Sequence, residues 1–285
     1  MRIPFFLICL LLVAPARAQA PAAPGRADPT LAEHPLPLLR GAAVYKAQAG
    51  VAVQKDDILE TGAAGAQVEA GQEAILALGP ETRVLVLDLP TAGRGTALAV
   101  LQGWVKLMTS GGKPAQVLTP DMQVSFASGS TILKRDGDGR DAVFAEEGAQ
   151  QLARVEKGRP GTPLKLAAEQ YAEIDPARPL PVAGRPPRAF ITTMPPSFRD
   201  RLARVPNLPN SGKALPARER DADFADVEPW LTARLPGVKS FVARFRPRLA
   251  DPAFRKPLER ALGQQPDWKA ALYPPARPSV SSTLF

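Results

Sequence analysis

Histidine and cysteine, the side chains that most often act as bases, nucleophiles or metal ligands, occur only once each in this chain of 285 residues. His34 lies in a proline-rich stretch near the start of the chain, and Cys9 lies in an apolar run that precedes it. The body of the chain therefore lacks the residues for a Ser-His-Asp or Cys-His device and for a zinc site of histidines or cysteines. We expect no metal, no cofactor and no enzymatic activity.

Two carboxylate pairs are the remaining candidates for acid–base chemistry, Asp56 with Asp57 and Glu146 with Glu147. Adjacent residues of a strand point to opposite faces, whereas glycoside hydrolysis needs two carboxyl groups that face each other across the substrate. We therefore predict that both pairs are solvated turn carboxylates. A glycan hydrolase or lyase that uses carboxylates alone stays as the least favoured alternative.

The segment DGDGRD at residues 136–141 resembles part of a calcium-binding loop. Such a loop needs an oxygen ligand at its fifth position and glycine at its sixth, and here those positions hold Arg140 and Asp141. Asp-Gly pairs between two β-prone runs are also typical of hairpin turns. We predict a hairpin turn and no metal site.

The first twenty residues have the pattern of a secretory signal peptide. Arg2 is followed by an apolar run over residues 5–13, and small residues at 16, 18 and 20 allow cleavage after Ala18 or after Ala20. The apolar run is shorter than the roughly twenty residues that a membrane-spanning helix needs. We expect a periplasmic protein of a Gram-negative cell that is not an integral membrane protein after cleavage and that contains no disulfide bond.

The rest of the chain divides by hydrophobic period into two parts joined by proline-rich stretches. Short β-prone runs recur between turn signals over residues 40–175, and Met122, Val124 and Phe126 alternate with polar residues, as in a strand with one buried face. Beyond residue 196 the apolar residues follow a helical period. The predicted organisation is a linker at 21–39, an all-β domain at 40–175, a second linker at 176–196, a small α-helical region at 197–273 and a disordered tail at 274–285.

Charge is distributed unevenly between these parts. Residues 1–186 contain 19 basic and 19 acidic side chains, whereas residues 187–285 contain 17 basic and 9 acidic ones. Arg244, Arg246 and Arg248 lie close together in the basic part and could bind an anionic envelope lipid or polymer, or an acidic envelope protein. The alternative is a solvated polar face on small helices. We expect no nucleic acid partner for an exported chain.

Five short motifs occur in the order found in the periplasmic FecR-type domain. They are DDILETG at residues 56–62, LGPET at 78–82, VLQGWVKL at 100–107, VLTP at 117–120 and EG at 147–148. The chain resembles this family over about residues 50–175. The resemblance implies a short β-solenoid or roll, in which Gly62, Gly79, Pro80, Gly103, Thr119, Pro120 and Gly148 have structural roles.

The chain departs from the iron-transport regulators of that family at its N-terminus. Those proteins carry a cytoplasmic segment that binds a sigma factor and a transmembrane helix, and a signal peptide takes that place here. We therefore predict a non-enzymatic exported protein that acts as a binding or signal-relay module in the cell envelope. A protein that binds cell-wall or surface polysaccharide is the main alternative, and it would present clustered exposed aromatic residues, for which Trp104 is a candidate.

Overall fold

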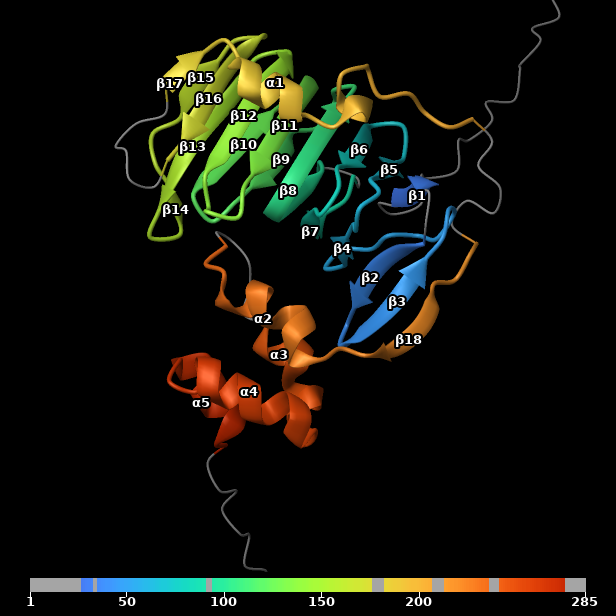
Figure 1. Cartoon of the computed structure of the whole chain (residues 1–285), viewed down its shortest axis with the longest axis vertical. Coiled ribbons are helices and arrows are strands. Elements are labelled where there is room, and N and C mark those ends of the chain that lie inside the picture. The colour runs from blue at the N-terminus through green and yellow to red at the C-terminus, as the bar shows by residue number, and fades with distance from the viewer. Residues whose placement is uncertain are drawn as a thin grey trace, which may run out of the picture.

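The computed structural model describes residues 27–32, 35–90, 94–175, 182–206, 213–235 and 241–274. The expected signal peptide and nearly all of the expected disordered tail lie outside these ranges, so those two expectations remain predictions. The described part of the chain forms two β-sheets, with helices at its C-terminal end (Figure 1).

The two sheets share one long strand, β8 (Ala97–Thr109). The first sheet runs in the order β1 (Ala27–Ala32), β5 (Ala66–Ala70), β6 (Ala74–Leu78), β8, β11 (Gly129–Arg135), β12 (Asp141–Glu147), β16 (Gln170–Ile174) and β17 (Val182–Gly184). The second runs in the order β18 (Ala217–Asp221), β3 (Ala43–Ala47), β2 (Leu36–Arg40), β4 (Ile58–Glu60), β7 (Arg83–Asp88), β8, β9 (Ala115–Leu118), β10 (Met122–Phe126), β13 (Gln150–Glu156) and β15 (Leu164–Leu166). The short strand β14 (Arg159–Pro160) pairs with the end of β13.

The main hydrophobic core lies between the two sheets. It joins Val68 and Leu107 of the first sheet to Leu38, Val84 and Val124 of the second in one buried cluster. The predicted alternation is confirmed in β10, where every second side chain is buried. This arrangement is a sandwich in which each sheet presents one face inward and needs a separate cover for the other.

The all-β prediction for residues 40–175 is confirmed, because the described residues of that range form strands and turns without a helix. The solenoid itself is not confirmed. Stacked turns of a solenoid would pair equivalent strands in parallel, whereas the described strands pair antiparallel except for β8 with β9; one isolated bridge, Val51 with Ala214, is also parallel. In the described residues both sheets end in free edge strands, so the sheets are not closed.

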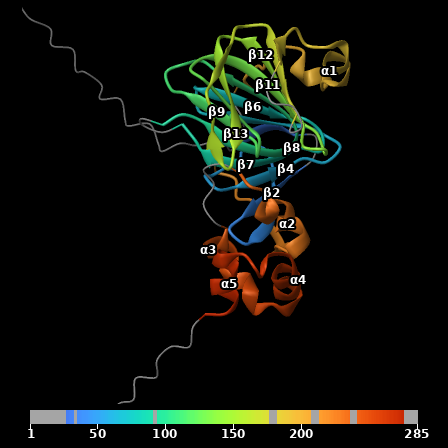
Figure 2. The same cartoon turned by 90° about the vertical axis from the view of Figure 1, so that its left-hand side faces the viewer.

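Helices cover the outer face of the second sheet. They are α2 (Phe224–Thr232), α3 (Val242–Phe245), the 3-10 helix η2 (Arg246–Ala250), α4 (Pro252–Leu262) and α5 (Pro266–Leu272). Their buried aromatic residues, among them Trp230 and Phe254, form one cluster with Ile58 and Leu85 of the sheet. This helical lobe lies at one end of the sandwich in both views (Figures 1 and 2). None of the described helices is long and apolar enough to cross a membrane.

A second cover lies on the outer face of the first sheet. It consists of α1 (Arg188–Thr193), the 3-10 helix η1 (Pro196–Phe198) and the extended residues that follow to 205, and we call residues 187–205 the strap. Phe190, Met194, Phe198 and Leu202 of the strap are buried at four-residue intervals against this sheet. Figure 2 shows α1 and the helical lobe at different ends of the molecule.

The boundaries differ from those expected at both linkers and in the helical region. β2 begins inside the expected first linker, and β17 lies inside the expected second one. Residues 27–32, expected in the first linker, pair with β5 as an edge strand, and α1 begins inside the expected second linker. β18 lies inside the expected helical region and pairs with β3. Local proline content indicated linkers, but backbone pairing with distant strands orders β1 and β18, and the buried side chain of Phe190 orders α1.

Candidate functional site

The first three family motifs meet at one corner of the sandwich. Thr61 Oγ1 donates to the carbonyl oxygen of Gly79 at 2.6 Å and accepts from the backbone N–H of Thr82 at 2.8 Å. Gly79 N–H donates to the carbonyl of Trp104 at 2.8 Å, and Trp104 N–H donates to Thr82 Oγ1 at 3.0 Å. Nearby, Gly62 accepts from the N–H of Glu81. These contacts are structural, because they satisfy backbone groups where the chain passes from β6 to β7.

Gly103 marks the point where β8 leaves one sheet and enters the other. Its φ of +95° is disfavoured for other residues, and a Cβ atom would lie 2.6 Å from Thr82 Cα. A Cβ on Gly79 would lie 2.7 Å from Trp104 Cβ. Pro80 follows Gly79 in the turn between β6 and β7. The motif residues at this corner are thus explained by close approach of the backbone.

A second corner contains the motif residues Thr119 and Pro120, between β9 and β10. Thr119 Oγ1 donates to Asp141 and accepts from Met122 N–H at 2.9 Å, while Arg135 donates to Asp141 Oδ1 at 2.8 Å. Burial raises the pKa of Asp141 to about 6, and the nearby Arg135 and Thr119 partly oppose this shift. Gly148 lies at a third close approach, since its Cβ would be 2.5 Å from the carbonyl oxygen of Ser128.

The carboxylate pairs are less exposed than predicted. Asp57 is 1% exposed and forms a bidentate pair with Arg40 at 2.6 and 2.9 Å, so the prediction of a solvated carboxylate is wrong for this residue. Glu146 is partly buried and accepts from Lys106 at 2.7 Å. Asp56 and Glu147 are exposed, as predicted. Asp57 and Glu146 are less exposed than predicted because each pairs with a basic side chain of a strand distant in sequence. Such a partner cannot be predicted from the neighbouring residues in the sequence.

The hairpin predicted at residues 136–141 is confirmed. β11 and β12 pair through it, and Asp136 Oδ1 accepts the backbone N–H groups of Asp138 and Arg140. The carboxylate therefore caps its own turn. Among the described residues, no three side chains of histidine, cysteine, aspartate or glutamate gather in a way that could hold a metal ion.

An aromatic cluster lies where the strap crosses the first sheet. The ring of Phe190, from α1, lies 5.0 Å from the ring of Trp104, 5.1 Å from Tyr171 and 6.4 Å from Phe144, measured between centroids. Lys134 Nζ lies 5.3 Å from the centroid of the Trp104 ring. Trp104 is 9% exposed and Tyr171 is 7% exposed, so neither ring forms the open aromatic platform that polysaccharide binding predicts.

Two hollows flank α1 above this cluster. The larger is about 560 Å³ and extends from Pro80, Gly103 and Trp104 to the strap. The smaller is about 260 Å³, and its lining includes Lys134, Tyr171 and Glu173. Asp136 and Thr193 line both hollows, so they form one discontinuous groove on the two sides of α1. This groove, beside the motif corner, is the candidate binding site.

The C-terminal half of the strap is held by polar contacts with the first sheet. Lys106 is fully buried and its ammonium group donates to the carbonyls of Phe198 and Asp200, both at 2.8 Å. Gln67 Nε2 donates to the carbonyl of Ala203, and Arg204 donates to Glu69 and to the carbonyl of Gly71. These contacts fix the strap at its η1 end.

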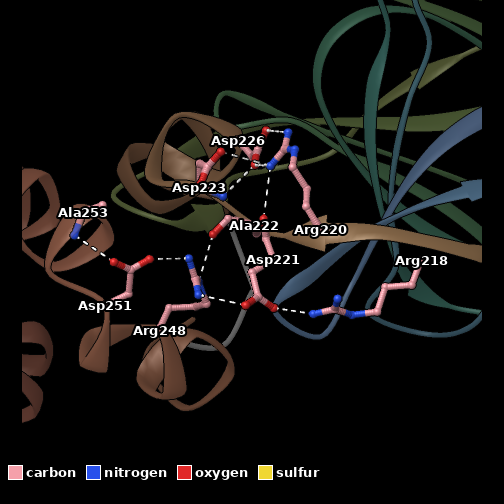
Figure 3. Close-up of polar contacts among 9 residues, drawn as sticks. All are labelled: Arg218, Arg220, Asp221, Ala222, Asp223, Asp226, Arg248, Asp251 and Ala253. Carbon is pink, nitrogen blue, oxygen red and sulfur yellow. Dashed lines mark hydrogen bonds and ion pairs between the residues drawn. The ribbon is translucent and has the colours of Figure 1, made fainter.

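The arginines predicted to bind a partner lie in the helical lobe and are used unequally. Arg248 donates to Asp221, to Asp251 and to the carbonyl of Ala222. Figure 3 shows this contact as part of a network that joins β18 to the lobe, which also includes Arg220 with Asp226. Two arginines thus make structural ion pairs between elements.

Arg244 joins the lobe to the sandwich directly. Its guanidinium donates to the carbonyl oxygens of Gly41, Asp56 and Leu39 at 2.6, 2.6 and 2.8 Å. Burial lowers the pKa of Arg244 to about 10, and the nearby carboxylates of Asp57 and Asp56 only partly oppose this shift. Arg246, in contrast, is exposed. The prediction that these arginines bind a partner stays a prediction, and among the three Arg246 is the most available for it.

No family model and no curated protein matches the chain. Two solved structures resemble part of it, both of a provisionally assigned anti-sigma factor from Parabacteroides distasonis. Their identities are 14% and 16%, their TM-scores are 0.40 and 0.39, and each alignment covers 47% of this chain and 62% of the other.

The groove and its neighbourhood were largely missed by the sequence-based interpretation. The four-residue spacing from Phe190 to Leu202 was a signal for an amphipathic cover, but the prolines within it favoured a linker. Lys106, in the midst of apolar residues of β8, was a signal for a buried charge. No local pattern indicated that Tyr171 and Trp104 would lie under the same helix.

Proposed function

We propose that this protein is a non-enzymatic, exported FecR-type module of the Gram-negative cell envelope, and that it binds a partner in the groove around α1. The FecR assignment rests on the five motifs and on the way the first three meet at one hydrogen-bonded corner. That corner forms a wall of the larger hollow through Pro80, Gly103 and Trp104. The proposed binding site therefore lies on the region that carries the family resemblance.

One observation carries the non-enzymatic part of the proposal, which is the use of the charged groups next to the groove. Arg135 pairs with Asp141 and Asp121, and Tyr171 donates to Glu173 Oε2 at 3.0 Å. Asp141, the fully buried carboxyl group, is held by Arg135 and Thr119. An acid–base pair for hydrolysis needs two carboxyl groups free to face a substrate, whereas Asp141 and Glu173 of the smaller hollow are engaged in structural contacts. The groove thus suits recognition better than catalysis.

The export part of the proposal is tested by fractionation of cells. The full chain and a chain without residues 2–20 are each expressed with a C-terminal tag. We expect the full chain in the periplasmic fraction, shortened at Ala18 or Ala20, and the truncated chain in the cytoplasm. A full chain that stays in the cytoplasm contradicts export.

The binding part is tested by photo-crosslinking in intact cells. A photoreactive amino acid is placed at Gln102 or Thr192, which line the larger hollow, and in a matched control at Lys157, which lines neither hollow. We expect discrete adducts from Gln102 and Thr192 that are absent from Lys157, and mass spectrometry identifies the attached species. Identical adduct patterns at all three positions contradict a binding role for the groove.

A further inference from the structure

The strap is held to the first sheet in two different ways along its length. Residues 198–205 are tethered by the polar contacts of Lys106, Gln67, Glu69 and Arg204. In the described structure, the polar contacts of α1 are local, such as Phe190 N–H to the carbonyl of Pro187 and Thr193 Oγ1 to the carbonyl of Ala189. In the described structure, α1 contacts the sheet through the apolar side chains of Phe190 and Met194.

The surface on both sides of α1 is hollowed. Here α1 lies between two open hollows of about 560 and 260 Å³. Its outward side chain Ile191 is 40% exposed. Among the described residues of this segment, Phe190 and Met194 are the ones buried against the sheet.

The ring of Phe190 fills a pocket formed by the aromatic rings of Trp104, Phe144 and Tyr171. Trp104, Phe144 and Tyr171 come from β8, β12 and β16 of the first sheet, so regular strands hold these three rings in place. Their distances to Phe190 and the tilted or edge-on orientations are those of favourable aromatic pairs. An aromatic side chain from another molecule could make the same contacts if α1 moved aside.

We propose that the pocket formed by Trp104, Phe144 and Tyr171 binds an aromatic side chain of a partner's peptide segment, and that α1 is its displaceable occupant. This inference rests on the binding role proposed above for the groove. The partner segment carries an aromatic residue with proline close on either side, the chemistry that α1 itself presents as PPRAFITTMPP over residues 186–196. Proline restricts the free segment and so lowers the entropy lost on binding. The tethers at Lys106 keep the strap attached while α1 is displaced.

The test uses the full mature chain and a fluorescein-labelled peptide of residues 186–196. Phe190→Ala empties the pocket, and Ile191→Ala is the matched control because Ile191 lies on the same helix and is partly exposed. The apparent affinity of a site that is closed most of the time is lowered in proportion to the fraction of molecules in which it is open. We expect the peptide to bind Phe190→Ala at least tenfold more tightly than wild type or Ile191→Ala. The same peptide with alanine in place of phenylalanine is expected not to bind.

Equal affinity of the peptide for folded Phe190→Ala and for wild type overturns the inference. If circular dichroism shows that Phe190→Ala is unfolded, a second measurement on the wild-type chain decides. The peptide then carries p-benzoylphenylalanine in place of its phenylalanine, and adducts are expected in β8, β12 or β16. Adducts that are scattered or absent overturn the proposal. Discrete crosslinks from Gln102 in cells, without peptide binding in these assays, would leave the proposed function intact and remove only this inference.

Discussion

At the scale of single residues, two buried charged side chains stabilise the first sheet. Lys106 binds the strap, and Asp141 lies at the base of the hairpin between β11 and β12. Lys106 is fully buried, and its three donors are used by Glu146 and two strap carbonyls. Asp141 is buried between Thr119 and Arg135. A buried charge is tolerated only when hydrogen bonds replace its water, so the loss of one partner leaves the others exposed to the full desolvation penalty.

Replacement of Lys106 by methionine tests the first of these groups. Lys106→Met keeps much of the side-chain volume but leaves two carbonyl groups and Glu146 without their donor. We expect the free energy of unfolding to fall by about 2–4 kcal/mol, measured by urea denaturation. Lys113→Met is the control, since Lys113 pairs with Glu73 at the surface and is 25% exposed, and it should cost less than about 1 kcal/mol. Equal losses for the two variants would contradict the anchoring role.

Asp141 predicts a dependence of stability on pH. Its folded-state pKa of about 6 lies above the ordinary value of 3.8, so the folded protein binds this proton more tightly than the unfolded chain does. The contribution of Asp141 to stability is therefore complete below about pH 4 and is lost as the pH rises through 6. Asp141→Asn does not titrate. We expect the stability of wild type relative to Asp141→Asn to fall by up to about 3 kcal/mol between pH 4 and 7.

The measurement is a series of urea denaturation curves for both proteins at each pH. The difference between the two proteins removes the contributions of the other titrating groups. Asp138→Asn provides the control for loss of a charge in the same hairpin, where Asp138 is exposed. A difference between wild type and Asp141→Asn that stays constant from pH 4 to 7 would refute the assignment.

At the scale of secondary structure, the long strand β8 determines how the sandwich is assembled. Its first half pairs with β7 and β9 in one sheet, and its second half pairs with β6 and β11 in the other. The change occurs at Gly103, where the backbone adopts a positive φ and passes against Thr82. A residue with a side chain would have to displace the backbone of the neighbouring turn.

Substitution of this glycine tests the bend in β8. Gly103→Ala combines an unfavourable φ of +95° with a Cβ atom 2.6 Å from Thr82 Cα, so we expect a loss of at least about 3 kcal/mol in the free energy of unfolding. Gly41→Ala is the matched control, because Gly41 has a φ of +57° and open space around it, and it should cost about 1 kcal/mol. Thermal unfolding of both variants decides, and similar losses would show that close packing at Gly103 is unimportant.

At the scale of the whole molecule, the helical lobe and the sandwich form one connected structure. An apolar cluster crosses their boundary from Trp230 and Phe245 to Ile58 and Leu85. Arg244 adds three hydrogen bonds to backbone carbonyls of the sandwich. The helical lobe is thus docked on the β domain. Two of the three arginines predicted to bind a partner, Arg244 and Arg248, are used for internal contacts, whereas Arg246 is exposed.

We therefore expect substitution of Arg244 to weaken docking of the helical lobe more than substitution of Arg246 does. Arg244→Met leaves three carbonyl groups without their donor and should lower the free energy of unfolding by about 2–3 kcal/mol. Amide hydrogen exchange of Arg244→Met should show a larger loss of protection, relative to wild type, in α3 and α4 than in the strands of the two sheets. Arg246→Met, at an exposed position, should change either measurement by less than about 0.5 kcal/mol. Equal effects of the two substitutions would contradict the docking role of Arg244.

Much of the β architecture could be predicted from local patterns. Alternation in β10 predicted its buried face, and Asp-Gly pairs predicted the hairpin between β11 and β12. The continuous apolar run at residues 84–87 is also typical of a strand covered on both sides, as β7 is. Asp251 followed by Pro252 is typical of a helix start, and Asp251 Oδ1 accepts the N–H of Ala253 at the start of α4. These features depend on residues close in sequence, so the sequence contains their signals.

The sequence by itself determined the types of strand and turn, the scarcity of histidine and cysteine, and the separation of a β part from a basic helical part. Only the tertiary structure decided which charges are buried and which segments cover the sheets. Asp57 with Arg40, Lys106 with the strap, and Arg244 with the carbonyl of Gly41 join residues 17 to 203 positions apart. Local propensity cannot encode such pairs, because their energies depend on the solvent that both partners lose when distant segments come together.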